Sequence, residues 1–201
     1  MKKALSLASA AALALSLAAC GPKAENKIDA AANATSDAMA AAGSATANAA
    51  DAIADAVTPT PSGQEFADKA AKSDAFEIAV AKLAQKEATS TDVKKFAADM
   101  IKAHTDSTAK VKAAAASASP AITPNPDLTE DQAEKLADLG KLKGADFDKA
   151  YIDGQVDAHE DALSLMQNYA KDGEVASLKA AAGDIAPVVQ KHLDMAKALN
   201  K

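Results

Sequence analysis

The chain has 201 residues, a formal net charge of −6 at pH 7 and a single cysteine. All its basic residues are lysines, aromatic residues make up 3%, and tryptophan is absent. Arginine forks, basic faces and aromatic stacking platforms are what nucleic-acid-binding proteins use, so this composition argues against nucleic acid as a partner. One cysteine also excludes an intramolecular disulfide.

The N-terminus has the pattern of an export signal. Met1-Lys2-Lys3 is a short positive start, and residues 4–19 are apolar apart from serines. These are the first two regions of a secretory signal peptide. The apolar run is shorter than the roughly 20 residues that a membrane-spanning helix needs. We therefore predict that residues 1–19 are a signal peptide.

The end of this segment, Leu17-Ala18-Ala19-Cys20-Gly21, resembles the lipobox of bacterial lipoproteins. That resemblance implies that Cys20 receives lipid, palmitate included, and becomes the first mature residue. Because two or more acyl chains anchor a protein stably, Cys20 would be the contact with a membrane. Gly21 stands where inner-membrane lipoproteins often have Asp, which implies the periplasmic face of the outer membrane. An ordinary signal peptide with a chance cysteine is the alternative.

Residues 20–63 are predicted to be a lipidated stalk and linker. Half of residues 28–57 are alanine, and the larger side chains recur at helix-seam spacing. Alanine buries little area, so the stalk is helical in part or disordered. The prolines of the Thr58–Gly63 segment then mark a domain boundary. The stalk is either a plain tether or a contact for peptidoglycan or another protein.

Residues 64–201 are predicted to form one all-α domain. Their apolar residues recur at three and four, without the period of two that marks strands. Four long helices and two short turns indicate an antiparallel four-helix bundle. The long helices are predicted from the Ser62–Glu65 capping box to about 86, from the polar 89–92 segment to about 117, from about 145 to 171, and from about 174 to 199, with a kink at Pro187.

A short extra helix is predicted in the central crossover of the bundle. The crossover contains Pro120, Pro124 and Pro126, which disfavour helix. A second capping-box pattern, Thr129 to Gln132, then starts a short amphipathic segment. We expect Gly144 to end it.

The bundle segment resembles the bacterial domain-of-unknown-function family 4142, which is grouped with ferritin-like helical bundles. The resemblance covers Glu65 to Leu199 and implies a fold and an envelope location, but no established activity. Lys72-Ser73-Asp74 replaces the family's usual glycines. The matching stretches are Phe66-Ala67, Ala70-Ala71, Phe76-Glu77, Val93 to Ala97, Met100-Ile101, His104, Leu142 to Gly144, Phe147-Asp148, Tyr151, Asp157, His159, Ala186-Pro187 and His192-Leu193.

The three histidines, His104, His159 and His192, fall on three different predicted helices. At 100° per residue each lies near the middle of an apolar face, and Glu77 lies about 60° off the face of the first helix. If both short turns lie at the same end of the bundle, the heights are about 19 Å for Glu77 and about 22, 20 and 29 Å for the histidines in chain order. Three of these groups are nearly level, and His192 is about 8 Å away.

An acid and imidazoles that converge in an apolar interior suit Zn, Cu or Fe. We therefore name Glu77, His104, His159 and His192 as candidate metal ligands. The alternative is that each histidine hydrogen-bonds a neighbouring helix as an ordinary core residue. Ferritin-type di-iron sites need Glu-x-x-His, and here the residues three before the histidines are Ile101, Val156 and Val189.

No catalytic motif supports an enzymatic activity, and we assign no catalytic residue. His159-Glu160-Asp161 starts like a zinc-protease motif, but Leu163 stands at the second histidine position. The first functional hypothesis is a non-catalytic envelope lipoprotein with a structural or stress-related bundle. The alternative is a metal-binding, ferritin-like bundle that uses Glu77 and the three histidines. A helical adaptor is a third hypothesis.

Overall fold

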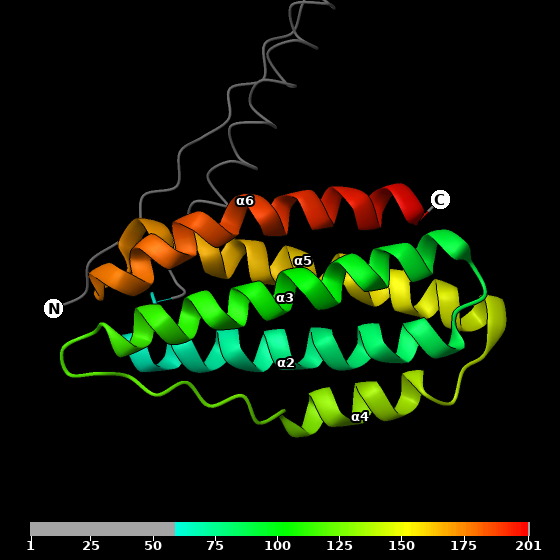
Figure 1. The fold of residues 1–201 in the computed structure, drawn as a ribbon, viewed down its shortest axis with the longest axis horizontal. Coiled ribbons are helices and arrows are strands. Elements are labelled where there is room, and N and C mark those ends of the chain that lie inside the picture. Colours follow the sequence, from blue (N-terminus) through cyan, green and yellow to red (C-terminus); the bar gives the residue numbers. More distant parts are fainter. Residues whose placement is uncertain (1–58, 201) are drawn as a thin grey trace, which may run out of the picture. The chain divides into compact units, whose positions relative to one another are not determined.

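The computed structural model describes residues 59–200, which form five α-helices with no strand among them (Figure 1). The all-α class is therefore confirmed. The predicted signal peptide, Cys20 and the alanine-rich stalk up to residue 58 lie outside the described residues. The helices are α2 (Gly63–Glu87), α3 (Thr91–Ala116), α4 (Glu130–Leu139), α5 (Gly144–Asp172) and α6 (Ala176–Leu199).

Side-chain caps mark where α2, α3 and α4 begin, as the sequence patterns predict, whereas α5 and α6 begin without one. At the start of α2, Ser62 Oγ accepts from Glu65 N at 3.3 Å, and Glu65 Oε2 accepts from Ser62 N at 2.8 Å. At the start of α4, Thr129 and Gln132 make the same reciprocal pair. Both capping boxes satisfy amide groups that a helix start leaves free. The ends of the long helices lie within two residues of the predicted ends.

Gly144 has a different role from the predicted one. Helix α4 ends at Leu139 with Gly140 as its C-cap, and Gly144 instead begins α5. The φ of Gly144 is 61°, in the left-handed region that residues with a Cβ rarely adopt. The glycine therefore turns the chain into α5 and does not terminate the short helix.

The four long helices form a ring in which each helix packs against two others. The order around the ring is α2, α3, α6, α5, and neighbouring helices run antiparallel (Figure 1). The antiparallel bundle is thus confirmed. Helix α4 lies outside the ring against α2 and α5. No helix within residues 59–200 has an apolar stretch long enough to cross a membrane.

The two short turns lie at opposite ends of the bundle, so the assumption that they share one end was wrong. The crossover that contains α4 carries the chain along the bundle from the end of α3 to the start of α5 (Figure 1). The α2–α3 turn therefore lies beside the start of α5, and the α5–α6 turn lies beside the start of α2.

Two separate apolar clusters fill the bundle. The first apolar cluster lies near the α2–α3 turn and includes Val80, Phe96, Met100, Phe147 and Tyr151. The second apolar cluster lies toward the other end and includes Phe66, Val111, Met166, Tyr169 and Leu178. Between them along every long helix are the buried polar residues, which we call the polar layer: Asp74, Glu77, His104, Gln155, His159 and His192.

Candidate metal centre

The polar layer exists because the core-facing seam of each long helix changes from apolar to polar near its middle. In α2 the buried seam positions are separated by four and three residues in turn, the spacing of a helix face that meets its neighbours. Alanines occupy this seam on both sides of two acids. The seam residues are Ala67, Ala70, Asp74, Glu77, Ala81 and Ala84.

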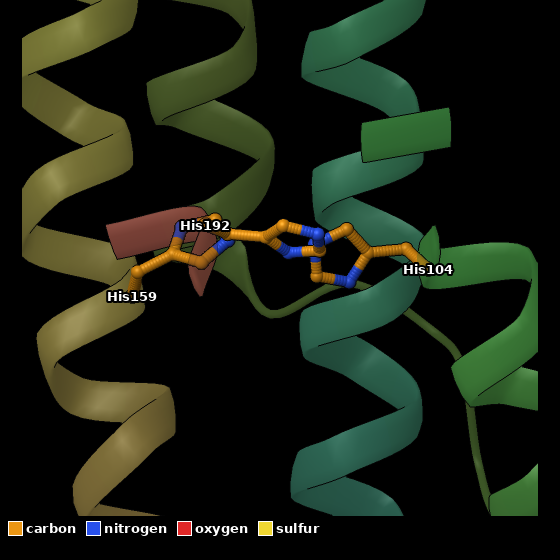
Figure 2. A group of neighbouring side chains, drawn as sticks. All are labelled: His104, His159 and His192. Atoms are coloured by element: carbon orange, nitrogen blue, oxygen red, sulfur yellow. The ribbon is translucent and has the colours of Figure 1, made fainter. Parts of the chain in front are cut away.

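The structure brings the three predicted histidines together. His104 from α3, His159 from α5 and His192 from α6 point toward one another (Figure 2). Their ring centroids are 5.6 to 6.0 Å apart. One possible ligand atom from each residue lies within 4.8 Å of the other two, and all three side chains are buried. Three helices of the ring therefore aim one imidazole each at a common point.

The expected 8 Å offset of His192 does not separate it from the other histidines. His104 lies 13 residues after the start of α3 and 12 before its end, so it is at mid-height whichever end the turns occupy. Counted from the observed α5–α6 turn, His159 is 13 residues away and His192 is 16. That difference is about 4.5 Å, which helix tilt and side-chain reach can absorb.

Hydrogen bonds fix two of the three rings through their Nδ1 atoms. His104 Nδ1 lies 2.8 Å from Asp74 Oδ1, and the other oxygen of Asp74 accepts from Thr108 Oγ1 at 3.1 Å. His159 Nδ1 lies 2.8 Å from the backbone oxygen of Gln155. A carbonyl oxygen only accepts, so His159 Nδ1 carries the proton, and in the neutral ring the lone pair is then on Nε2.

Each histidine also has one buried ring nitrogen without a hydrogen-bond partner. These atoms are His104 Nε2, His159 Nε2 and His192 Nδ1. A buried polar atom that forms no hydrogen bond costs free energy, so such atoms are few in native proteins. Three of them on three converging rings form a donor set suited to one metal ion.

Burial and neighbouring charges tune the three imidazoles differently. Burial lowers the pKa of His159 to about 4, with the charge of His104 acting in the same direction. Burial, then the charges of His159 and His104, lower the pKa of His192 to about 3. For His104 burial also lowers the pKa, but the Asp74 hydrogen bond and the charges of Glu77 and Asp74 raise it overall. Two rings are therefore neutral near pH 7, which is the form that binds metal.

Glu77, the fourth predicted ligand, lies in the polar layer but does not belong to the three-histidine group. Its Oε2 accepts a hydrogen bond from Gln155 Nε2 at 2.5 Å, and its Oε1 has no partner. Burial raises the pKa of Glu77, against the charge of His104 and the Gln155 hydrogen bond, which lower it.

Sequence reasoning missed the residues that support the histidines, Asp74 above all. A signal was present, because Asp74 lies four residues after Ala70 and three before Glu77, on the buried seam of α2. An acid at such a position needs a partner in a neighbouring helix, and His104 is that partner. Carboxylates that hold the second nitrogen of a histidine ligand fix its tautomer and make it more basic.

The geometry matches a site with three protein ligands. Metal–imidazole bonds are about 2.0–2.1 Å long, so nitrogens on a tetrahedral ion are about 3.4 Å apart. One possible ligand atom from each of the three histidines lies within 4.8 Å of the other two, a range that includes this spacing. Three protein ligands leave a fourth position for another molecule.

Comparison with known proteins places the chain among helical bundles of unknown function. The family model described as "Domain of unknown function (DUF4142)" matches residues 30–199. The resemblance seen in the sequence starts at Glu65, and the family model extends it by 35 residues toward the N-terminus. No curated protein matches the chain.

Two similar solved structures support the fold. One is a DUF305 fragment from Deinococcus radiodurans, with a TM-score of 0.60 and 12% identity over 70% of this chain and 96% of that chain. The other is CopM in its Cu(I)-bound form, with a TM-score of 0.57 and 16% identity over 69% of this chain and 94% of that chain. At these identities the likeness shows the fold alone.

Proposed function

This chain belongs to the DUF4142 family, whose description assigns no activity, and we propose that its bundle binds one copper ion through His104, His159 and His192. One observation carries the proposal. Three buried imidazoles from three helices each have a ring nitrogen without a hydrogen bond, and their possible ligand atoms lie within 4.8 Å of one another. Glu77 is outside this ligand set.

Copper fits this donor set better than zinc or iron. Among divalent first-row ions, copper binds a given nitrogen site most tightly, and imidazole suits it. Zinc accepts the same three ligands but binds less tightly by that order. Carboxylate ligands and the Glu-x-x-His motif of ferritin-type iron sites are missing from the three-histidine group. CopM, which has a similar fold, was solved with Cu(I) bound.

The competing interpretation treats the histidines as ordinary core residues. Hydrogen bonds account for one nitrogen of His104 and one of His159. They leave unexplained the three partnerless nitrogens. A metal ion would satisfy all three at once, which is why we prefer it.

We further propose that lipidated Cys20 holds this bundle at the periplasmic face of the outer membrane. The support is the lipobox at residues 17–21 and the glycine that follows the cysteine. The function is then that of an envelope-tethered metal binder, with no reaction assigned. Replacement of Cys20 by serine should move the protein from the membrane fraction to the soluble periplasm and abolish palmitate labelling. Unchanged membrane fractionation would contradict the anchor.

The metal site is tested by equilibrium dialysis of the full chain against copper and zinc, followed by elemental analysis. We expect one copper per chain in the wild type. The variants His104→Ala and His159→Ala should each lose this stoichiometric ion. The control is Lys191→Ala, which removes an exposed side chain next to His192 on α6.

Circular dichroism on the same samples tells loss of metal from loss of fold. Variants that keep their helical signal but bind no copper support the site. If the wild type binds no copper, or if the histidine variants bind it as well as Lys191→Ala does, the proposed function is wrong.

A further inference from the structure

A pocket of about 650 Å³ lies between α2, α4 and α5, and two residues of the polar layer, Glu77 and Gln155, are among those that line it. Ligand pockets fall within about 300–1,000 Å³. Helix α4 covers the pocket from outside the ring, with Leu139 at its end and Leu142 just after it among the lining residues. No histidine lines the pocket, so it is distinct from the candidate metal centre.

Three of the lining residues have buried polar side chains, and each of these has an oxygen without a hydrogen-bond partner. They are Glu77 Oε1, Tyr151 Oη and Gln155 Oε1, and each residue is only 2% exposed. The hydrogen bond from Gln155 Nε2 to Glu77 turns the amide oxygen away from that carboxylate. Tyr151 and Gln155 lie one turn apart on α5, so their side chains are neighbours.

The other lining residues are mostly apolar or acidic. The apolar walls come from Phe76, Val80, Leu139, Leu142 and Leu165. The charged lining residues are Glu77, Asp138, Asp157, Asp161 and Lys135. Four acids against one lysine favour a ligand with a positive charge.

We propose that this pocket binds an amphipathic primary amine. Its ammonium group offers three N–H donors, which match the three partnerless oxygens of Glu77, Tyr151 and Gln155. Its hydrocarbon body would lie along Phe76, Val80 and Leu139. A buried ammonium needs an opposite charge close by. Burial alone raises the pKa of Glu77, but the charge of a bound ammonium would lower it again and favour the carboxylate.

Other ligand classes satisfy the pocket less well. A fatty acid would place its carboxylate against Glu77, and an alcohol of the same length has one O–H donor for three acceptors. The choice among these ligand classes does not depend on copper, because the three histidines proposed to bind copper do not line the pocket. The site can therefore be tested with metal removed by chelation.

The experiment titrates the full chain, metal-free, with octylamine, octanol and octanoate, which share one hydrocarbon body. Calorimetry gives the affinities, and amide chemical shifts show which helices respond. We expect octylamine to bind about tenfold or more tightly than octanol, because hydrogen bonds to charged groups are stronger. Octanoate should bind most weakly, and shifts should concentrate on α2, α4 and α5.

Matched variants decide whether the named oxygens cause the preference. Glu77→Gln keeps the shape and removes the charge, so the preference for amine over alcohol should fall about tenfold, while octanol affinity stays the same. Tyr151→Phe should weaken amine binding by a smaller factor. The control Glu160→Gln removes an exposed carboxylate, paired with Lys197, that does not line the pocket.

Three results would each overturn the proposal. One is that octylamine fails to bind at millimolar concentration. Another is that octylamine and octanol bind equally well to the wild type. The third is that Glu77→Gln keeps the same preference as Glu160→Gln. None of these results tests copper binding, so either of the two proposals can fail while the other holds.

Discussion

The two apolar clusters and the polar layer between them are built from the same four helices, yet they contain opposite kinds of side chain. The clusters stack aromatic and aliphatic residues, as in the parallel rings of Phe66 and Tyr169 with centroids 3.9 Å apart. Apart from the tyrosines of the two clusters, all the buried polar and charged residues found within residues 59–200 lie in the polar layer. Burial of apolar surface stabilises a fold, whereas burial of polar groups without full pairing destabilises it.

This contrast distinguishes the residues that stabilise the bundle from the residues of the proposed binding sites. Five side-chain atoms of the polar layer lack hydrogen-bond partners: Glu77 Oε1, His104 Nε2, Gln155 Oε1, His159 Nε2 and His192 Nδ1. Natural proteins depart from good local packing mainly at functional sites. The clusters therefore supply the stability, and the polar layer contains the groups on which both proposed binding sites depend.

The largest effect should follow from damage to an apolar cluster. Phe96 is buried in the first apolar cluster and packs edge-on against Tyr151, with ring centroids 6.2 Å apart. Phe96→Ala removes a large side chain and leaves a cavity, so the free energy of unfolding should fall by about 3–5 kcal/mol. Urea denaturation followed by circular dichroism measures this.

The control for Phe96→Ala is Val188→Ala, which truncates an exposed apolar side chain, 41% accessible, on α6. Its effect should stay within about 0.5 kcal/mol. A loss below about 1 kcal/mol for Phe96→Ala would contradict the assignment of stability to the clusters. Copper stoichiometry should be unchanged in both variants.

Much of this fold could be predicted because its signals are local. Ser62 and Thr129 each form a capping box with the residue three positions later, so the starts of α2 and α4 follow directly from the sequence. Apolar spacing placed the three histidines on inward faces for the same reason. A residue's direction on a helix depends only on its position in that helix.

What could not be predicted depends on relations between helices. The sequence does not say how far the crossover between α3 and α5 travels, so the two turns were placed at one end. The partner of His104 was missed because Asp74 is 30 residues away and on another helix. The pocket under α4 was missed because it depends on where a short helix rests against two longer ones.

The second prediction concerns a variant in which part of the polar layer is replaced by apolar side chains like those of the clusters. His159→Leu with His192→Leu keeps side-chain volume similar and removes two polar groups. Replacement of buried polar groups by apolar groups of similar shape can be nearly neutral or stabilising. The metal-free double variant should therefore be at least as stable as the wild type to urea, and it should bind no copper.

The pH dependence of that gain identifies its cause. Burial lowers the pKa of His159 to about 4 and that of His192 to about 3, whereas a histidine in an unfolded chain has a pKa near 6.5. As the pH falls below 6.5, the unfolded wild type takes up protons that the folded form does not, so its stability falls. The advantage of the double variant should grow between pH 7 and pH 5. A constant difference would mean that packing alone, and not the imidazoles, explains the gain.

The smallest effect tests whether the polar layer works as a unit or as three separate ligands. Asp74 is buried and bonds His104 Nδ1 at 2.8 Å, but it is not part of the three-histidine group. Asp74→Asn keeps an oxygen that can accept from Nδ1 and removes the charge that makes the ring a stronger ligand, so copper affinity should fall about 10–100-fold.

The control is Asp106→Asn, which removes an exposed carboxylate two residues from His104 and paired with Lys102. Competition titration against a copper chelator measures both variants. Equal affinities would mean that Asp74 only satisfies a buried histidine, whereas a selective loss at Asp74 extends the metal centre to a fourth helix, α2, and makes it a property of the whole bundle.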